Sequence, residues 1–242
     1  MEKEIALVTG GVTGIGNAIA LALARQGYHV VVCDVDEARG RAMEGDNADV
    51  SFRRCDVTSE QQVRQLVSDV HSEFGRIDVL INNAGIIRRR TDEEISVSDW
   101  DDVFAVNARG AFLFCSSVSP IMKNQQWGRI VNISSIAGKL GDITSAPGYG
   151  PSKAAMDGLT KTFARELAPY GVTVNGVAPH AIQTEMSAQW SEAKRREIIE
   201  AIPLKRLGQP YEVAAAVLFL VSADAGFITG EIIDLNGGMI MD

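Results

Sequence analysis

Two side chains in the segment Arg129–Lys153 have the types and spacing of a proton-transfer pair. Tyr149 and Lys153 lie four residues apart at the start of a predicted helix, so they share one face, one turn apart. An ammonium beside a phenol stabilises the phenolate, so the tyrosine can exchange a proton well below its reference pKa of about 10. The pair is therefore a candidate general acid/base, although the same spacing is common in ordinary surface pairs. Whether the pair is catalytic or an ordinary surface pair depends on the elements that position these two residues.

A glycine-rich turn near the N-terminus has the features of a dinucleotide site. An apolar segment over 4–8 predicts a strand, and the turn Thr9–Gly16 leads from it into a predicted helix over 15–26. A second predicted strand, 28–33, ends at Asp34. Such glycines admit a pyrophosphate, the helix N-terminus stabilises its charge, and an acid about twenty residues on binds a ribose diol. The alternative is a plain turn whose glycines serve only packing.

Short apolar segments alternate with helical patterns along the rest of the chain. The other predicted strands are 50–55, 77–81, 129–133, 172–178 and 231–235, and the other main predicted helices are 59–74, 99–124, 151–170 and 210–222. Almost continuously apolar, β-branched strands are typical of a parallel sheet with helices on both faces. No linker or repeat divides the sequence. We predict one doubly wound α/β domain over residues 1–242, built on a seven-stranded parallel sheet.

Composition narrows the class of protein. The 242 residues are 46% hydrophobic and 22% charged, which is ordinary for a soluble globular protein, and the net charge of −8 disfavours nucleic-acid binding. No apolar run is long enough to cross a bilayer, and the N-terminus lacks a signal-peptide pattern. The three cysteines are widely spaced, so we predict reduced core residues and no metal site. We expect a cytoplasmic protein.

Polar residues follow six of the predicted strands, at the sheet edge where ligands bind in such folds. These strand-end residues are Gly10–Gly16, Asp34, Asp56, Asn82–Gly85, Ser134–Ser135 and Pro179–Thr184, and the chain also carries Asn107 and the pair Tyr149 and Lys153. With these motifs the chain resembles the short-chain dehydrogenase/reductase family along essentially its full length. The resemblance implies a Rossmann fold and an oxidoreductase that interconverts a secondary alcohol and a ketone.

The resemblance also implies roles for single residues. Tyr149 exchanges the alcohol proton while nicotinamide C4 exchanges a hydride with the carbon, and Ser135 orients the carbonyl oxygen. Lys153 binds the nicotinamide ribose and lowers the tyrosine pKa, and Asn107 helps to hold a water through which protons reach Lys153. A structural asparagine at a helix kink is the alternative for Asn107. The implied cofactor contacts are Gly10, Thr13, Gly14, Ile15, Gly16, Asp34, Asp56, Val57, Asn83, Ala84, Gly85, Tyr149, Lys153, Ile182 and Thr184.

Charge at Asp34 indicates which cofactor is used. A carboxylate at the ribose 2′-position repels a 2′-phosphate, and residues 35–37 supply no basic side chain to offset it. Position 13, often basic in relatives that use NADP, is Thr13. We therefore predict NAD(H).

Two departures from the family pattern affect the site. Ser135 lies fourteen residues before Tyr149, where many relatives have thirteen, so we expect the extra residue within Asp142–Gly148 and keep Ser134 as the alternative serine. The usual glycine after the sixth strand is His180, which either faces the substrate or is a tolerated loop residue. A third departure, Asn236 in place of aspartate, is expected to change little.

The identity of the substrate is the property that the sequence determines least. A predicted lid over about 186–204 carries Trp190 and a charged helix, and Arg88, Arg89 and Arg90 follow the fourth strand. The arginines either form a solvated loop or contact a substrate carboxylate. Because the run Asn82–Arg89 resembles that of sugar-acid dehydrogenases in this family, we expect a small polar or sugar-acid hydroxy compound.

Two competing functions remain open. The chain also resembles 3-oxoacyl-acyl-carrier-protein reductases, but these usually prefer NADPH and present basic residues where this chain has Gln126 and Tyr170. A non-catalytic NAD(H) sensor is a different class, disfavoured because both Tyr149 and Lys153 are present. The resemblance further implies a homotetramer formed through the helices at about 101–124 and 151–170.

Overall fold

The computed structural model describes residues 3–141 and 147–241, which contain a seven-stranded, all-parallel sheet in the order β3-β2-β1-β4-β5-β6-β7. The strands are β1 (Ile5–Thr9), β2 (His29–Asp34), β3 (Val50–Arg54), β4 (Val79–Asn82), β5 (Gly128–Ile133), β6 (Val172–Pro179) and β7 (Ile232–Leu235). The predicted doubly wound α/β fold is confirmed, and each strand lies within two residues of its expected bounds.

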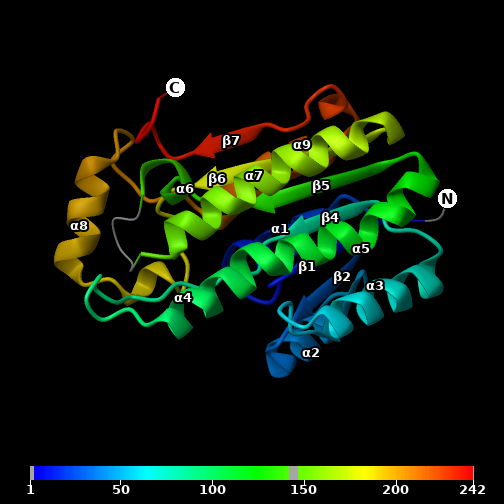
Figure 1. Cartoon of the computed structure of the whole chain (residues 1–242), viewed down its shortest axis with the longest axis horizontal. Coiled ribbons are helices and arrows are strands. Elements are labelled where there is room, and N and C mark those ends of the chain that lie inside the picture. Colours follow the sequence, from blue (N-terminus) through cyan, green and yellow to red (C-terminus); the bar gives the residue numbers. More distant parts are fainter. Residues whose placement is uncertain (1–2, 142–146, 242) are drawn as a thin grey trace.

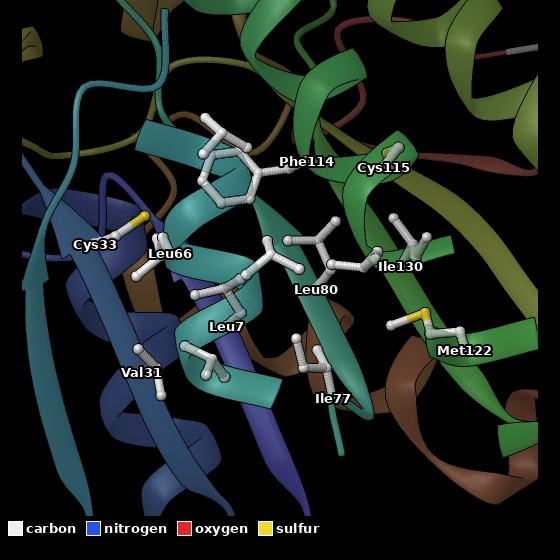
Figure 2. Packing of buried hydrophobic residues seen from close by; sticks show 14 of the residues in the cluster. Leu7, Val31, Cys33, Leu66, Ile77, Leu80, Phe114, Cys115, Met122 and Ile130 are labelled. Atoms are coloured by element: carbon white, nitrogen blue, oxygen red, sulfur yellow. The ribbon is translucent and has the colours of Figure 1, made fainter. Parts of the chain in front are cut away.

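Helices cover both faces of the sheet, as Figure 1 shows. On one face lie α3 (Glu60–Phe74), α5 (Gly110–Gln125) and α7 (Tyr149–Leu167), and on the other lie α1 (Gly14–Arg25) and α9 (Pro210–Val221). Neighbouring strand residues point to opposite faces, so Leu7 packs in the first layer and Val8 in the second. Figure 2 shows Leu7 of β1, Leu66 of α3 and Phe114 of α5 among the buried side chains of this first layer.

The three cysteines are free and buried, as predicted. Within the described residues, no helix combines the length and apolar character needed to span a bilayer.

Two helices were not predicted from the sequence. Helix α2 (Glu37–Asp46) buries only Gly40 and Met43, so it lacks the apolar stripe that reveals a helix. The sequence feature that indicates this helix is its N-cap residue, Asp36, whose carboxylate accepts a hydrogen bond from the Arg39 amide. The four-residue helix α6 (Ala137–Leu140) is too short to show periodicity.

The long helix predicted over 99–124 is interrupted. It consists of α4 (Val97–Phe104), a π-helical turn at Ala105–Arg109 and then α5. Asn107 sits in the π turn, a rare feature that often marks a functional position. Helix α7 also departs from expectation: it begins at Tyr149, two residues before the predicted start, so the tyrosine is its first residue.

The carboxyl ends of all seven strands point to one edge, where α4, α6 and α8 (Glu192–Ala201) gather (Figure 1). Helix α8 extends the charged helix predicted at 192–197 by four residues. This edge is where a parallel sheet of this type binds its ligand.

Candidate active site

A cavity of about 540 Å³ opens at the carboxyl edge of the sheet. Its lining comes from segments that follow β1 to β6, together with α8 and the C-terminal segment. The predicted site residues that line it are Gly10, Thr13, Gly14, Ile15, Asp34, Asp56, Val57, Asn83, Ala84, Gly85, Ser135, Tyr149, Lys153, Ile182 and Thr184. Two predicted residues, Gly16 and Asn107, do not line it and lie behind its wall.

Glycines shape the turn after β1. Gly10 has a φ of +61°, and a Cβ there would lie 2.8 Å from the Ala84 Cα, closer than atoms pack. A Cβ on Gly16 would lie 2.2 Å from the Gly10 carbonyl oxygen. Gly16 therefore serves the close packing of α1 against the turn, while Gly10 lets the main chain face the cavity.

The N-terminus of α1 is suited to an anion. Its cap residue Thr13 makes no side-chain capping bond within the described residues, and its first turn carries no acid. By contrast, Ser59 caps α3 and Ser191 caps α8. Amides left without a capping oxygen at a helix N-terminus bind phosphate well, and the nearby glycines leave room for it. The residues present thus fit a dinucleotide pyrophosphate, with Thr184 against Gly14 on the opposite side.

Asp34 ends β2 with its carboxylate fixed by the main chain. Oδ1 accepts from the amides of Val35 and Asp36 at 2.7 and 3.2 Å, which leaves Oδ2 for a ligand such as a ribose hydroxyl. The basic side chain that reaches this region from α2 is Arg39, whose guanidinium donates to Glu185 at 3.0 Å. That ion pair also joins α2 to the segment after β6.

Asn83 has a structural contact at the cavity wall. Its Nδ2 donates to the carbonyl oxygens of Thr9 and Gly10 at 3.1 and 2.7 Å. The amides of Asn83 and Ala84 both donate to the Thr9 hydroxyl. These bonds hold the segment after β4 against the glycine-rich turn and so set the width of the cavity between them.

The tyrosine–lysine pair is assembled at the start of α7. The Lys153 ammonium lies 5.8 Å from the centre of the Tyr149 ring and donates to the Ile133 carbonyl at 2.7 Å. Lys153 is only 3% exposed, and this burial lowers its pKa to about 8, opposed by the negative charge of Asp157. The lysine is thus still largely cationic at neutral pH, as a stabiliser of a phenolate must be.

The two serines after β5 both line the cavity but differ in burial. The Ser135 Oγ is partly exposed and accepts from the Ala137 amide at 3.2 Å. Ser134 is buried, and its hydroxyl donates to the Lys153 carbonyl at 3.4 Å. The hydroxyl of Ser134 is thus bound to α7, and the assignment of Ser135 to the substrate stays a prediction.

Asn107 lies behind the lysine. Its Oδ1 accepts from the Ile86 amide at 2.8 Å, and its Nδ2 donates to the Ile86 carbonyl and the Ser152 hydroxyl, both at 3.0 Å. A Cβ on Gly85 would lie 3.5 Å from both Asn107 Oδ1 and Lys153 Nζ, so the two groups approach one point. The role of Asn107 in holding a water stays a prediction.

The substrate side contains two of the uncertain residues. His180 lines the cavity, and burial lowers the pKa of its imidazole, which favours the neutral ring. Among the three arginines, Arg89 lines the cavity and donates to the Met186 carbonyl at 3.1 Å. Arg88 instead pairs with Asp99 and Asp102 of α4, and Arg90 is exposed.

The predicted lid contributes a wall of the cavity through Met186, Trp190, Lys194, Glu197, Ile198 and Ala201. The Arg89 guanidinium lies 5.9 Å from the Trp190 ring centre. The Trp190 indole N–H is buried without an acceptor in the described part of the chain. The insertion expected within Asp142–Gly148 falls mostly on 142–146, which lie outside the described residues.

Comparison with known proteins identifies the family. Residues 10–240 match a family model described as enoyl-(acyl carrier protein) reductase. The chain is 40% identical to the 3-oxoacyl-[acyl-carrier-protein] reductase FabG of Aquifex aeolicus (strain VF5), covering 99% of this chain and 98% of the relative. It is 38% identical to the enzyme of that name from Thermotoga maritima (strain ATCC 43589), covering 100% and 99%.

A solved structure, that of gox2181, agrees with a TM-score of 0.95 at 34% identity, covering 99% of this chain and 96% of that one. Fold and relatives together define an oxidoreductase class that acts on CH–OH or keto groups with a nicotinamide dinucleotide. The chain belongs to the short-chain dehydrogenase/reductase family. The relatives favour the 3-oxoacyl reductase alternative over the sugar-acid expectation.

Proposed function

We propose that this protein is an NAD(H)-dependent reductase of 3-oxoacyl thioesters, and that Tyr149, Lys153, Ser135 and Asn107 form its catalytic group. The observation that carries the substrate class is the identity of about 40% with 3-oxoacyl-[acyl-carrier-protein] reductases over the whole chain. The same relatives extend over all the elements that build the cavity, including the segment after β6.

The chemistry of the substrate wall supports an acyl substrate. Apart from a few charged residues, this wall consists of apolar side chains: Ile86, Ile87, Ile136, Ala137, Met186, Trp190, Ile198, Ala201 and Met239. An apolar wall stabilises an acyl chain by burial, whereas a polyhydroxy acid needs a polar partner for each buried hydroxyl. The indole N–H of Trp190, which lacks an acceptor within the described residues, is a suitable donor to a thioester carbonyl.

The site residues then divide the work of ketone reduction. Bound nicotinamide supplies the hydride that reaches the keto carbon. Tyr149 donates its phenolic proton to the oxygen as charge develops there, and the Ser135 hydroxyl donates a hydrogen bond to the same oxygen. The buried Lys153 ammonium stabilises the resulting phenolate. In the reverse direction, Tyr149 accepts the proton of the alcohol.

The preference for NAD(H) rests on Asp34. Its fixed carboxylate lies where an adenosine ribose would meet the end of β2, and a 2′-phosphate there would bring two anions together. Arg39 approaches from α2 but is paired with Glu185. Arg54 is exposed opposite Asp34 in the sheet register. A phosphate would need one of these cations to turn toward it.

A sugar acid is the second candidate, favoured by one observation. Arg89 is the arginine of the three that lines the cavity, and a guanidinium suits a planar carboxylate.

A substrate panel at fixed NADH separates the candidates. It contains acetoacetyl-CoA, a 3-oxoacyl carrier-protein thioester, keto acids of hexoses and simple diketones, with oxidation of NADH followed at 340 nm. We expect the highest kcat/KM with the thioesters. Turnover confined to the sugar keto acids would replace our proposal by the second candidate, and NADH binding without any turnover would favour the sensor.

We also propose a cytoplasmic homotetramer that pairs through α5 and α7. Phe112 of α5 is 45% exposed and packs on the buried Phe163 of α7, so one large apolar side chain remains exposed at this face. Light scattering on Phe112→Asp should show a smaller particle than the unaltered protein. An unchanged mass would place the interface elsewhere.

A further inference from the structure

An ion pair at the rim of the cavity joins two segments that are far apart in the chain. A terminal nitrogen of the Arg39 guanidinium, on α2, donates to the Glu185 carboxylate at 3.0 Å. Glu185 follows β6 and lines the cavity, as Asp34 does at the end of β2. The pair therefore connects the helix beside Asp34, where we place the adenosine ribose, to the segment that leads into the lid.

Acidic side chains act on this guanidinium from both segments. The Arg39 Nε atom lies 3.5 Å from the Asp36 carboxylate, and the Asp36 amide donates to Asp34 Oδ1 at 3.2 Å. The contact with Glu185 is the shorter of the two contacts to carboxylates. In the same order, the pKa of Arg39 is raised most by Glu185 and less by Asp36 and Asp34. The cation nearest to the ribose end of the cavity on α2 is thus bound to a carboxylate of the other segment.

A phosphate would compete with Glu185 for this cation. The side chains of Arg39 and Glu185 are 50% and 71% exposed, and an ion pair so open to solvent is weak. A phosphate monoester carries up to about two negative charges at neutral pH, and it accepts two parallel hydrogen bonds from one guanidinium. A cofactor that ends in a 2′-hydroxyl offers no such group, so it gains nothing when Arg39 leaves Glu185.

We propose that Glu185 is a selectivity residue for the cofactor, because it holds Arg39 in an ion pair and so keeps this cation from a 2′-phosphate. The proposal rests on the proposed preference for NAD(H) and assigns part of that preference to the segment after β6. Two carboxylates then act against the same phosphate. Asp34 repels it directly, and Glu185 occupies the arginine that would otherwise bind it.

The test is the binding of NADH and NADPH to the full chain, followed by fluorescence titration. In Glu185→Gln the Kd of NADPH should fall about threefold to tenfold, while the Kd of NADH should change by less than about twofold. Adding Arg39→Met to this variant should remove the gain, as a double-mutant cycle would show. A gain that persists without Arg39 would mean that Glu185 acts by repulsion alone, or that Arg54 binds the phosphate, and would overturn the proposal.

Glu37→Gln is the matched control. Glu37 is an exposed carboxylate at the start of the same helix, and it pairs with Arg41 at 3.7 Å. Its loss removes the same charge from the same helix, so the Kd of NADPH should change by less than about twofold. An equal gain in Glu37→Gln and Glu185→Gln would show that only the net charge matters. An equal shift for NADH and NADPH in Glu185→Gln would show that the pair only holds the lid, and either result would overturn the proposal.

The same titrations in an Asp34→Ser background measure the effect where the repulsion by Asp34 has been removed. Glu185→Gln should again strengthen NADPH binding about threefold to tenfold. If the unaltered protein binds NADPH more tightly than NADH, the proposed cofactor preference fails, while the ratio between Glu185→Gln and its parent still decides this inference. Equal Kd values for NADPH in parent and variant, in both backgrounds, would overturn it.

Discussion

The two walls of the cavity are built in different ways. On the side where we propose that the nucleotide binds, the main chain does most of the shaping: glycines bring backbone against backbone, and Asp34 is fixed by amides next to it in sequence. On the substrate side, long side chains from separate segments meet, such as Arg89 against Trp190. A wall fixed by backbone geometry constrains residue type and spacing, so it can be recognised in a sequence. A wall of side chains can change its ligand without changing the fold.

The largest effect on activity is expected for a substitution of Tyr149, which lies at the boundary between the two walls. Tyr149→Phe keeps the ring beside Lys153 but removes the proton, so kcat should fall by about 10³-fold. NADH binding, measured by fluorescence titration, should change by less than about threefold, since the nucleotide wall is untouched. Loss of both properties together would mean that the tyrosine is structural.

Adding one methyl group at Gly16 should disrupt the wall of the cavity that contains the glycine-rich turn. Gly16→Ala places a Cβ 2.2 Å from the Gly10 carbonyl oxygen, and the strain should cost about 3 kcal/mol of stability and weaken NADH binding. Gly158→Ala is the control, because its Cβ would meet nothing within 4 Å. That variant should gain about 0.5–1 kcal/mol from helix propensity. Thermal unfolding of both variants checks the contrast, which fails if Gly16→Ala is as stable as Gly158→Ala.

Cofactor choice should depend mainly on Asp34. Asp34→Ser removes the charge that opposes a 2′-phosphate, so the ratio of kcat/KM for NADH over NADPH should fall about tenfold or more. Steady-state kinetics with both cofactors measure it. If the unaltered enzyme already prefers NADPH, the assignment of Asp34 is wrong.

The substrate wall should respond more weakly and more selectively. Arg89→Met removes the guanidinium that lines the cavity and holds the Met186 carbonyl, so KM should rise about threefold to tenfold for a substrate with a carboxylate and less for a neutral one. Arg88→Met removes only pairs to α4 and should leave both KM values alone. Equal effects of the two variants would show that Arg89 does not reach the substrate.

The sequence was sufficient for the sheet, and it pointed to the glycine-rich turn and Asp34, which line one wall of the cavity. Apolar strands, the glycine spacing and Asp34 follow from local geometry that permits few other residues. Helix α2 was not predicted because it packs through Gly40, where a Cβ would clash with the Phe52 ring. A helix with almost no apolar stripe leaves no periodic signal.

Two features of the site could not be predicted from the sequence, because they depend on tertiary contacts. Sequence spacing could not separate Ser134 from Ser135, because only the packing of α7 shows that the Ser134 hydroxyl is buried and donates to the Lys153 carbonyl. The π turn at Asn107 likewise depends on the contacts that the amide makes with Ile86 and Ser152, far apart in the chain.

The most direct test of the account is the fate of the hydride. The enzyme is incubated with acetoacetyl-CoA and NADH carrying deuterium at both C4 positions, and the 3-hydroxy product is examined by mass spectrometry. The account predicts one deuterium at C3 of the product for each NADH oxidised, and product formation about 10³-fold slower with Tyr149→Phe. Absence of labelled 3-hydroxyacyl thioester, while NADH is oxidised by a sugar keto acid, would contradict it.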